Sequence, residues 1–300
     1  MDRYISVAFN LPISTSFTYR LDEGQEAILG SRVIASFGKR SLAGFVVGTE
    51  VDPPKNLPEI KTIRRVLDSE PLFDENYLDL AHWMAGMYFC SLGESLSAMI
   101  PGGRREVALP GLGTDEASFK EGDIVPNDEQ QRAINAILEK ERGLFYVYGI
   151  TGSGKTEVFL QVAKQSIADG GSVIYLVPEI SLTHQVVDTI KQRLDENAAV
   201  LHSRLSPSQR LREWRRIQRG EVNLVIGARS AVFAPVKNLK LIILDEEHEG
   251  SYKSASVPRY HARQIAMRRC AVEKARLVMG SATPSIEAWE QMEEGNIHRL

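Results

Sequence analysis

A phosphate-binding loop is the strongest chemical signal in the sequence. Residues 149–156 read GITGSGKT, which fits the pattern G-x-x-x-x-G-K-[ST] and stands between an apolar run and a helical pattern. Glycines let the backbone turn tightly and bring its N–H groups close to phosphate oxygens. We expect Lys155 to reach the β- and γ-phosphates of a nucleoside triphosphate and the Thr156 hydroxyl to bind Mg²⁺. The predicted nucleotide contacts in this loop are Gly149, Thr151, Gly152, Ser153, Gly154, Lys155 and Thr156.

An acidic cluster further along the chain supplies the second half of this chemistry. Residues 241–248 read LIILDEEH, an apolar run that ends in acidic residues. Asp245 is expected to hold Mg²⁺ opposite Thr156, and Glu246 to orient and deprotonate the attacking water. Lys155, Asp245 and Glu246 are therefore the predicted catalytic residues. The loop alone does not select a class, since kinases, GTPases and AAA-type ATPases share it.

Strands alternating with helices must position these residues. From residue 127 onward several short runs are continuously apolar, as expected for strands buried on both faces, and helical patterns separate them. This alternation predicts an α/β domain over residues 127–300, with a parallel sheet and right-handed crossovers. The predicted strands are at 144–149, 172–178, 198–203, 222–228, 239–246 and 275–283.

The first part of the chain has a different pattern. Residues 1–105 contain β-type runs separated by Pro, Gly and polar turns, followed by a helical repeat of apolar residues from Tyr77 to Tyr88. We expect a small β-rich domain closed by one helix. Residues 106–126 contain Gly, Pro and acidic residues without a period and are predicted to be a linker. The predicted strands are at 4–9, 16–21, 31–37 and 42–51.

Composition limits the remaining classes. The net charge is −3, so any binding of nucleic acid must use local patches. The densest basic run, residues 204–219, contains six arginines and is either a solvated helix face or a set of phosphate contacts. Two cysteines do not make a disulfide framework or a cysteine-rich zinc module. The sequence shows neither the pattern of a secretory signal nor an apolar run long enough to span a membrane, so we expect a cytoplasmic protein that does not bind a membrane.

Shorter motifs resemble those of superfamily 2 helicases, in the same order along the chain. DEEH is a form of their DExH box, and Gln130 matches the glutamine of the Q-motif, which reads adenine. PEISLT at 178–183 resembles motif Ia, which lies along single-stranded DNA, and GSAT at 280–283 resembles motif III. By this resemblance His248, Ser281 and Thr283 are expected to couple the nucleotide site to DNA.

Longer stretches resemble the PriA family of replication-restart helicases. They include YGITGSGKTEVF, LHSRLSPSQRLREW, VIGARSAVFAP and LDEEHEGSYKSASVPRYHARQIA, and in the first region FTYRL, RVIASFGKR and VLDSEPLF. The resemblance implies ATP-driven 3′–5′ unwinding at stalled or branched forks. It also implies contacts with other primosome proteins and with single-strand-binding protein. Zinc is expected for the family, but the family's zinc-binding cysteines are absent from this chain.

The same resemblance implies two DNA-binding groups. Phe17, Thr18, Gly38 and Lys61 match a pocket that captures a DNA 3′ end, although Thr18 stands where the family has Asp. An aromatic ring, a glycine turn and a lysine suit stacking on a base and contact with a phosphate. The segment after DEEH resembles an aromatic-rich loop that senses single-stranded DNA. Its predicted contacts are Tyr252, Lys253 and Tyr260.

Two departures from the family shape the functional expectation. The 106–126 stretch is too short for the winged-helix domain that the family carries, and the chain ends soon after motif III. We expect a truncated form with only the first motor lobe, which hydrolyses ATP slowly and does not unwind DNA alone. The alternatives are a non-hydrolysing module that binds ATP and DNA, another superfamily 2 DNA translocase, or a different P-loop enzyme.

Overall fold

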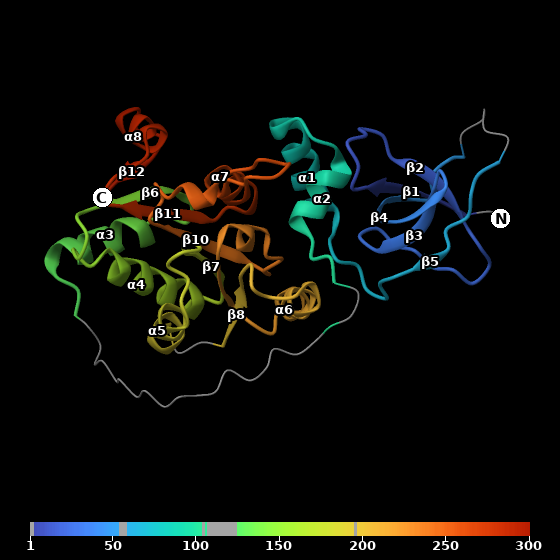
Figure 1. Cartoon of the computed structure of the whole chain (residues 1–300). Coiled ribbons are helices and arrows are strands. Elements are labelled where there is room, and N and C mark those ends of the chain that lie inside the picture. The colour runs from blue at the N-terminus through green and yellow to red at the C-terminus, as the bar shows by residue number, and fades with distance from the viewer. Residues whose placement is uncertain (1–2, 54–58, 104–105, 107–124, 195–196) are drawn as a thin grey trace. The chain divides into compact units, whose positions relative to one another are not determined.

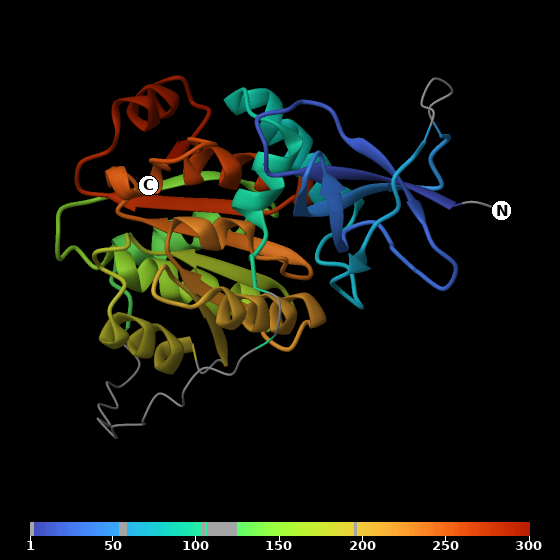
Figure 2. The same ribbon diagram turned by 45° about the vertical axis from the view of Figure 1, so that its right-hand side comes forward.

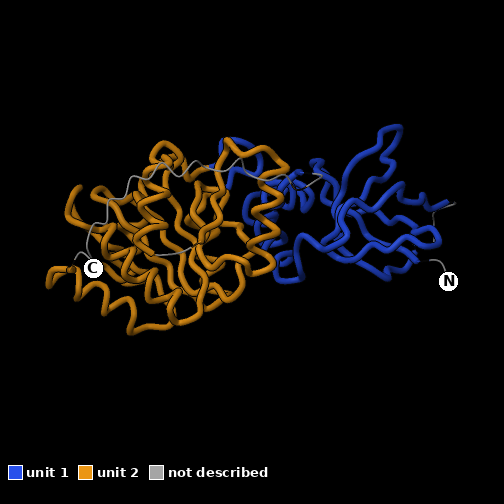
Figure 3. Tube along the Cα trace, turned by 90° about the horizontal axis from the view of Figure 1, so that it is seen from below, with its two compact units in different colours: residues 1–104, 254–260 blue, residues 105–253, 261–300 orange. Residues whose placement is uncertain are grey.

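The chain divides into two units that differ in their type of sheet. The computed structural model describes residues 3–53, 59–103, 106, 125–194 and 197–300. Unit 1 comprises residues 1–104 with 254–260, and unit 2 comprises residues 105–253 with 261–300, as Figure 3 shows in blue and orange. Most of the predicted linker, 106–126, lies outside the described residues. The two units are described separately below.

Unit 1 is built on an antiparallel five-stranded sheet with the order β2-β1-β4-β3-β5. Alternating side chains form its core, because successive residues of a strand point to opposite faces. Val7 and Val46, for example, are fully buried. The predicted β-rich domain is confirmed. The strands are β1 (Arg3–Phe9), β2 (Phe17–Leu21), β3 (Arg32–Phe37), β4 (Arg40–Thr49) and β5 (Arg65–Val66).

The described residues of unit 1 also form two helices, where the sequence indicated one. α1 (Glu75–Tyr88) begins at the N-cap Asp74 and matches the predicted helix. α2 (Leu92–Met99) begins at Ser91, which forms a capping box with Glu94. Gly93 lets α2 approach β1 closely, because a β-carbon at this position would overlap the carbonyl oxygen of Phe9. The short α2 lacks a long apolar period, so packing on β1 rather than pattern defines it.

Unit 2 is a seven-stranded parallel sheet with the order β12-β6-β11-β10-β7-β9-β8. The central strand β10 is buried from Leu241 to Leu244, which explains its continuous apolar run. Each predicted strand of this region is present. The strands are β6 (Gly143–Tyr148), β7 (Ser172–Leu176), β8 (Ala198–Leu201), β9 (Leu224–Gly227), β10 (Leu239–Asp245), β11 (Arg276–Ser281) and β12 (His298–Arg299).

Helices cover both faces of this sheet (Figure 1 and Figure 2). α3, α4 and α5 bury apolar residues against one face. These residues form one core with alternate residues of the strands. α6, η1 and α7 lie on the opposite face. They connect strands that run back from β8 toward β11, whereas α4 and α5 connect strands that run from β6 to β8. Because the crossovers are right-handed, the two directions place their helices on opposite faces. This three-layer arrangement is consistent with a RecA-like lobe. The helices are α3 (Asp128–Leu138), α4 (Lys155–Ala168), α5 (His184–Leu194), α6 (Pro207–Arg219), η1 (Arg229–Phe233), η2 (Gly250–Tyr252), α7 (Ala262–Glu273) and α8 (Ile286–Glu293).

The arginine-rich run forms α6 and is more than a solvated face. Leu211, Trp214 and Ile217 are buried on this helix, and Arg215 is buried with them. The other arginines lie on its more accessible sides. Within the described ranges, none of the helices is both long enough and apolar enough to cross a membrane.

Candidate nucleotide-binding site

The phosphate-binding loop joins the end of β6 to the start of α4. Gly152 and Gly154 have φ angles of +81° and +84°, in the left-handed region that favours glycine. The Lys155 amine donates to the carbonyl oxygens of Gly149 at 2.8 Å and Ile150 at 3.1 Å. These bonds hold the lysine inside the turn, and the N-terminus of α4 faces the same loop. Thr151, Gly152, Ser153 and Thr156 are exposed, and Gly149 and Gly154 are half-buried.

Gln130 braces the loop from α3. Its Nε2 donates to the carbonyl oxygens of Ser153 at 3.2 Å and Gly154 at 3.4 Å, while its Oε1 accepts the N–H of Asn127 at 2.9 Å. A β-carbon at position 154 would lie 2.2 Å from this Nε2, so the glycine makes room for the amide. The structure therefore places Gln130 against the phosphate loop. Its predicted contact with adenine stays a prediction.

The predicted acids lie at the carboxyl edge of the sheet, next to the loop. Asp245 is in register with Gly280 of β11, and Gly280 with Val147 of β6. These three residues form a row across the sheet, and the phosphate loop begins two residues after Val147. The backbone N–H of Glu246 donates to Asp245 Oδ1 at 2.9 Å.

Asp245 is largely buried, and little positive charge nearby compensates its carboxylate. Desolvation, with a smaller contribution from the charge of Glu246, raises the pKa of Asp245 to about 6. The Glu246 N–H and the positive charge of Lys155 lower this pKa without reversing the shift. A bound cation would favour the ionised carboxylate, and the oxygen donors of Asp245 and Thr156 are the type that Mg²⁺ prefers.

The residues predicted to couple the site to DNA are brought together. The Ser281 hydroxyl lies 2.6 Å from Nδ1 of His248 and donates to Glu246 Oε2 at 3.3 Å. It also accepts the backbone N–H of Thr283 at 3.0 Å. One hydroxyl thus connects the acidic box to the GSAT segment, with the predicted water-activating carboxylate among its partners.

Glu247, between the predicted acids and His248, is a residue that the sequence analysis did not assign. Its side chain is fully buried and forms an ion pair with Arg263 of α7. It also accepts bonds from the Tyr146 hydroxyl at 3.2 Å, the Ser285 hydroxyl at 2.7 Å and the Ser285 N–H at 3.1 Å. Glu247 therefore ties β10 to β6, α7 and the segment before α8. In the sequence, its place in an acidic triplet is the only signal, and this does not tell a structural acid from a catalytic one.

The residues of the predicted DNA-sensing loop have different surroundings. Tyr252 is fully buried, and its hydroxyl donates to the carbonyl oxygens of Asp245 at 2.6 Å and Leu176 at 3.1 Å. This position does not fit stacking of its ring on a base, and it makes Tyr252 a support for the acidic box instead. Tyr260 is also buried, which likewise does not fit stacking. Lys253 is exposed.

In unit 1 the predicted 3′-end residues lie around β2. Phe17 packs edge-on against Phe37 with ring centroids 5.1 Å apart, and Gly38 follows in the exposed turn to β4 with φ +57°. Thr18 points to the opposite sheet face from Phe17, because side chains alternate along the strand. Lys61 is exposed beside β2, where its carbonyl oxygen accepts the N–H of Arg20 at 3.0 Å. The fold thus brings Phe17 and Gly38 together, while Thr18 faces away.

A protein-only metal cluster is absent from the part of the chain that the structure describes. Across those residues, no three or more His, Cys, Asp or Glu side chains are grouped as metal ligands. Cys90 and Cys270 are both free thiols. The predicted binding of Mg²⁺ by Thr156 and Asp245 stays a prediction.

The sequence matches two family descriptions. Residues 6–101 match the 3′ DNA-binding domain of PriA, and residues 127–292 match the DEAD/DEAH box helicase family. The Replication restart protein PriA of Treponema pallidum is 50% identical over 307 residues, covering 100% of this chain and 47% of that protein. The protein of that name in Haemophilus influenzae is 30% identical over 377 residues, covering 99% of this chain and 51% of that protein.

Solved structures give a weaker likeness. The crystal structure of the DUF1998 helicase MrfA has a TM-score of 0.43 and 21% identity, and covers 59% of this chain and 30% of its own. The chain spans about half the length of the curated relatives that it matches. The match to the helicase family extends over more than half of the chain. The chain therefore belongs to the DEAD/DEAH box helicases and carries the 3′ DNA-binding domain of PriA ahead of its helicase domain.

Proposed function

We propose that unit 2 is the ATP-binding lobe of a DNA helicase that translocates 3′ to 5′. The observation that carries this proposal is the row formed by Asp245, Gly280 and Val147, which sets the acidic box beside the phosphate loop. In this arrangement Lys155 contacts the β- and γ-phosphates and Glu246 orients the attacking water. The exposed loop N–H groups and the α4 N-terminus bind the remaining phosphate charge.

Thr156 and Asp245 would hold Mg²⁺. The raised pKa of Asp245 supports this assignment, because a buried carboxylate with little compensating charge gains most from a cation. The ion would neutralise charge on the phosphates. Two hydrogen bonds would hold Asp245 in place for this ion. The Glu246 N–H donates to Asp245 Oδ1, and the Tyr252 hydroxyl donates to the Asp245 carbonyl oxygen.

Substitution of Lys155 tests the nucleotide site. Lys155→Ala should abolish binding of a fluorescent ATP analogue in the presence of Mg²⁺, because the ammonium is the principal cation of the loop. Lys164→Ala, at an exposed position on the same helix, is the matched control and should bind as the parent chain does. Unchanged affinity of the Lys155 variant would remove this site assignment.

We propose that unit 1 binds the 3′ end of a DNA strand through Phe17, Gly38 and Lys61. The exposed glycine turn beside the Phe17–Phe37 pair supports this, since a strand end can approach the backbone there. Thr18 lies on the opposite face of the sheet, so we propose that it contributes less to this binding than Phe17 does. Fluorescence anisotropy with forks that carry a free or a blocked 3′ leading end tests the proposal. Phe17→Ala should remove the preference for the free end, and equal binding of both forks by the parent chain would contradict it.

The wider role follows from the curated relatives. We propose that the whole protein acts in replication restart at stalled forks, with primosome proteins and single-strand-binding protein as partners, in the cytoplasm. We also propose that the 300 residues alone turn ATP over slowly. Measurement of ATP turnover with and without forked DNA tests this last point, and rapid DNA-stimulated turnover would contradict it.

A further inference from the structure

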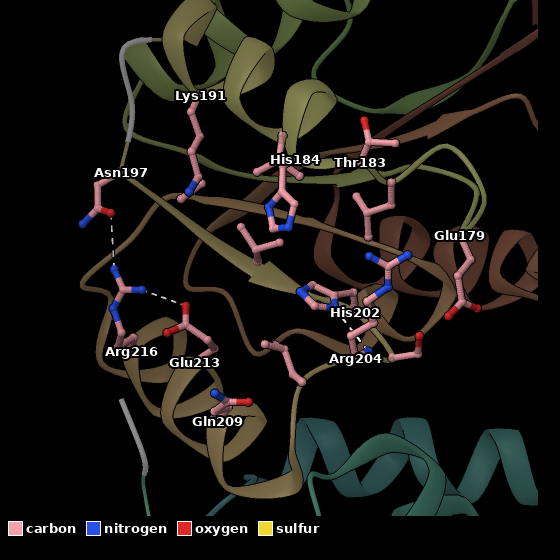
Figure 4. A pocket seen from close by; sticks show the side chains of 16 residues that line it. Glu179, Thr183, His184, Lys191, Asn197, His202, Arg204, Gln209, Glu213 and Arg216 are labelled. Carbon is pink, nitrogen blue, oxygen red and sulfur yellow. Dashed lines mark hydrogen bonds and ion pairs between the residues drawn. The ribbon is translucent and has the colours of Figure 1, made fainter. Parts of the chain in front are cut away.

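A groove of about 460 Å³ lies along the open edge of the unit 2 sheet. Residues of α5 line one wall, residues of α6 line the other, and β8 lies between them (Figure 4). Ala198 and Val200 of β8 line the groove, together with the apolar side chains of Val187 and Leu205. No residue of the phosphate loop or the acidic box contributes to it. One end of the groove includes Thr183, at the end of the PEISLT segment.

β8 borders this groove with the strand edge that does not pair with β9. Among the residues that the structure describes, β8 is the last strand of the sheet and pairs only with β9. The Leu201 carbonyl accepts the N–H of Ala228 at 3.1 Å, so the polar main-chain groups of Leu201 point toward β9. These groups alternate in direction along a strand, so those of Ala198 and Val200 point to the open edge. Within the described ranges, no main-chain hydrogen bond to this edge is present.

The walls of the groove carry positive charge. Neither Lys191 nor Arg204 has an ion-pair partner within 4 Å among the described residues, whereas Arg216 is paired with the buried Glu213 at 2.7 Å. Glu179 is an exposed acid at one end.

His202 adds a hydrogen-bond donor to this lining. The backbone N–H of Arg204 donates to His202 Nδ1 at 3.2 Å, so the neutral ring carries its proton on Nε2 and can donate it to a ligand. Burial first, and then the charge of Arg204, lower the pKa of His202, which keeps the ring neutral at pH 7. The groove thus presents positive charge and hydrogen-bond donors around an apolar floor.

These features select the kind of occupant. Unpaired main-chain groups on an edge strand bind another extended polypeptide by strand addition. A second copy of this chain would bring a groove with the same positive charge, and like charges disfavour that pairing. We propose that the groove binds an extended acidic segment of a partner protein, which adds to β8 as a further strand. Its acidic side chains would meet Lys191 and Arg204, and the apolar side chains between them would face the opposite wall of the groove.

Anisotropy with designed peptides tests this proposal on the full chain. The probe is a fluorescein-labelled eight-residue peptide that alternates glutamate and valine. Two matched peptides isolate its features: one has lysine in place of glutamate, and the other carries N-methyl groups on its four central amides. We expect the acidic peptide to bind at least about tenfold more tightly than either, because only it offers both charge and N–H donors. Hydrogen exchange should slow over residues 197–202 when it binds.

Variants locate the binding. Lys191→Glu combined with Arg204→Glu should weaken peptide binding by about tenfold or more, whereas Arg142→Glu, an exposed basic position elsewhere in unit 2, should leave it unchanged. Equal affinity for the N-methylated peptide, or no protection at 197–202, would overturn strand addition. A twelve-residue oligothymidine that binds more tightly than the peptide, and is lost in the same double variant, would show a nucleic-acid site instead.

Discussion

The carboxylate of Glu247 pairs with the guanidinium of Arg263, and this pair connects the two ends of the segment between β10 and α7. Both side chains are buried, with exposed fractions of 0% and 8%. Ser285 and Tyr146 complete the hydrogen bonding of the carboxylate. The third residue of the acidic box therefore organises the site, while its neighbours Asp245 and Glu246 face the nucleotide edge.

Glu247→Gln should destabilise unit 2 strongly. The substitution keeps the volume of the side chain but leaves the buried Arg263 with only the exposed carboxylate of Glu287, 3.9 Å away, as a counter-charge. Loss of the buried partner costs about 3–5 kcal/mol. The expected result is a fall in unfolding temperature of roughly 10 °C, measured by differential scanning calorimetry. Glu246→Gln is the matched control and should change the unfolding temperature little, because Glu246 is half-exposed. Equal effects of the two substitutions would contradict the assignment of a structural role to Glu247 alone.

Tyr252→Phe should loosen the acidic box without opening a cavity. The lost hydroxyl donates to the carbonyl oxygens of Asp245 and Leu176, and both would remain buried. The expected cost is about 1–3 kcal/mol of stability, together with weaker Mg²⁺-dependent nucleotide binding. Tyr148→Phe is the control, because Tyr148 is exposed and its ring packs against Trp289, a contact that the substitution keeps. Thermal melts and titration with an ATP analogue measure the two effects, and unchanged nucleotide affinity would limit Tyr252 to stability.

Much of this fold could be predicted from the sequence because its strands have simple patterns. The buried strands of unit 2 are continuously apolar and are present where the sequence predicts them. The predicted phosphate loop has fixed spacing and lies between β6 and α4. α2 was missed because an eight-residue helix with a glycine at its second position has little pattern of its own. Its position depends on the close approach of Gly93 to Phe9, which is a tertiary contact.

Residues of the candidate site could be predicted where the residue type itself indicates the chemistry. Residues whose role depends on their surroundings in the fold were harder to predict. Glycines, a lysine and a carboxylate indicate a phosphate site directly. By residue type alone, Tyr252 could stack on a DNA base and Glu247 could act in catalysis. Their burial and hydrogen bonds show instead that both support the acidic box. Likewise, no local pattern indicates that β8 forms the sheet edge, because strand order is a property of the whole domain.

Gln130→Ala should weaken nucleotide binding by removing the brace on the phosphate loop. The amide donates to the carbonyl oxygens of Ser153 and Gly154, so its loss should affect ATP and GTP alike. If Gln130 also reads adenine, the loss should be larger for ATP, and parallel titrations with both nucleotides separate the two roles. Gln131→Ala, which removes an exposed bond to Asn135, is the control. Unchanged affinity for both nucleotides would contradict the bracing role.

Asp245→Asn should stabilise the nucleotide-free chain above about pH 6 while removing Mg²⁺-dependent nucleotide binding. Burial raises the pKa of Asp245 from 3.8 to about 6, so the folded state binds this proton more tightly than the unfolded state does. The free energy of unfolding therefore falls as the pH rises from about 4 to about 6, and the full penalty of about 1–3 kcal/mol remains above that range. Melts should show the variant to be more stable at about pH 8 and the difference to shrink by about pH 5. A variant that is less stable than the parent chain at the higher pH would show that Asp245 is not an uncompensated buried carboxylate.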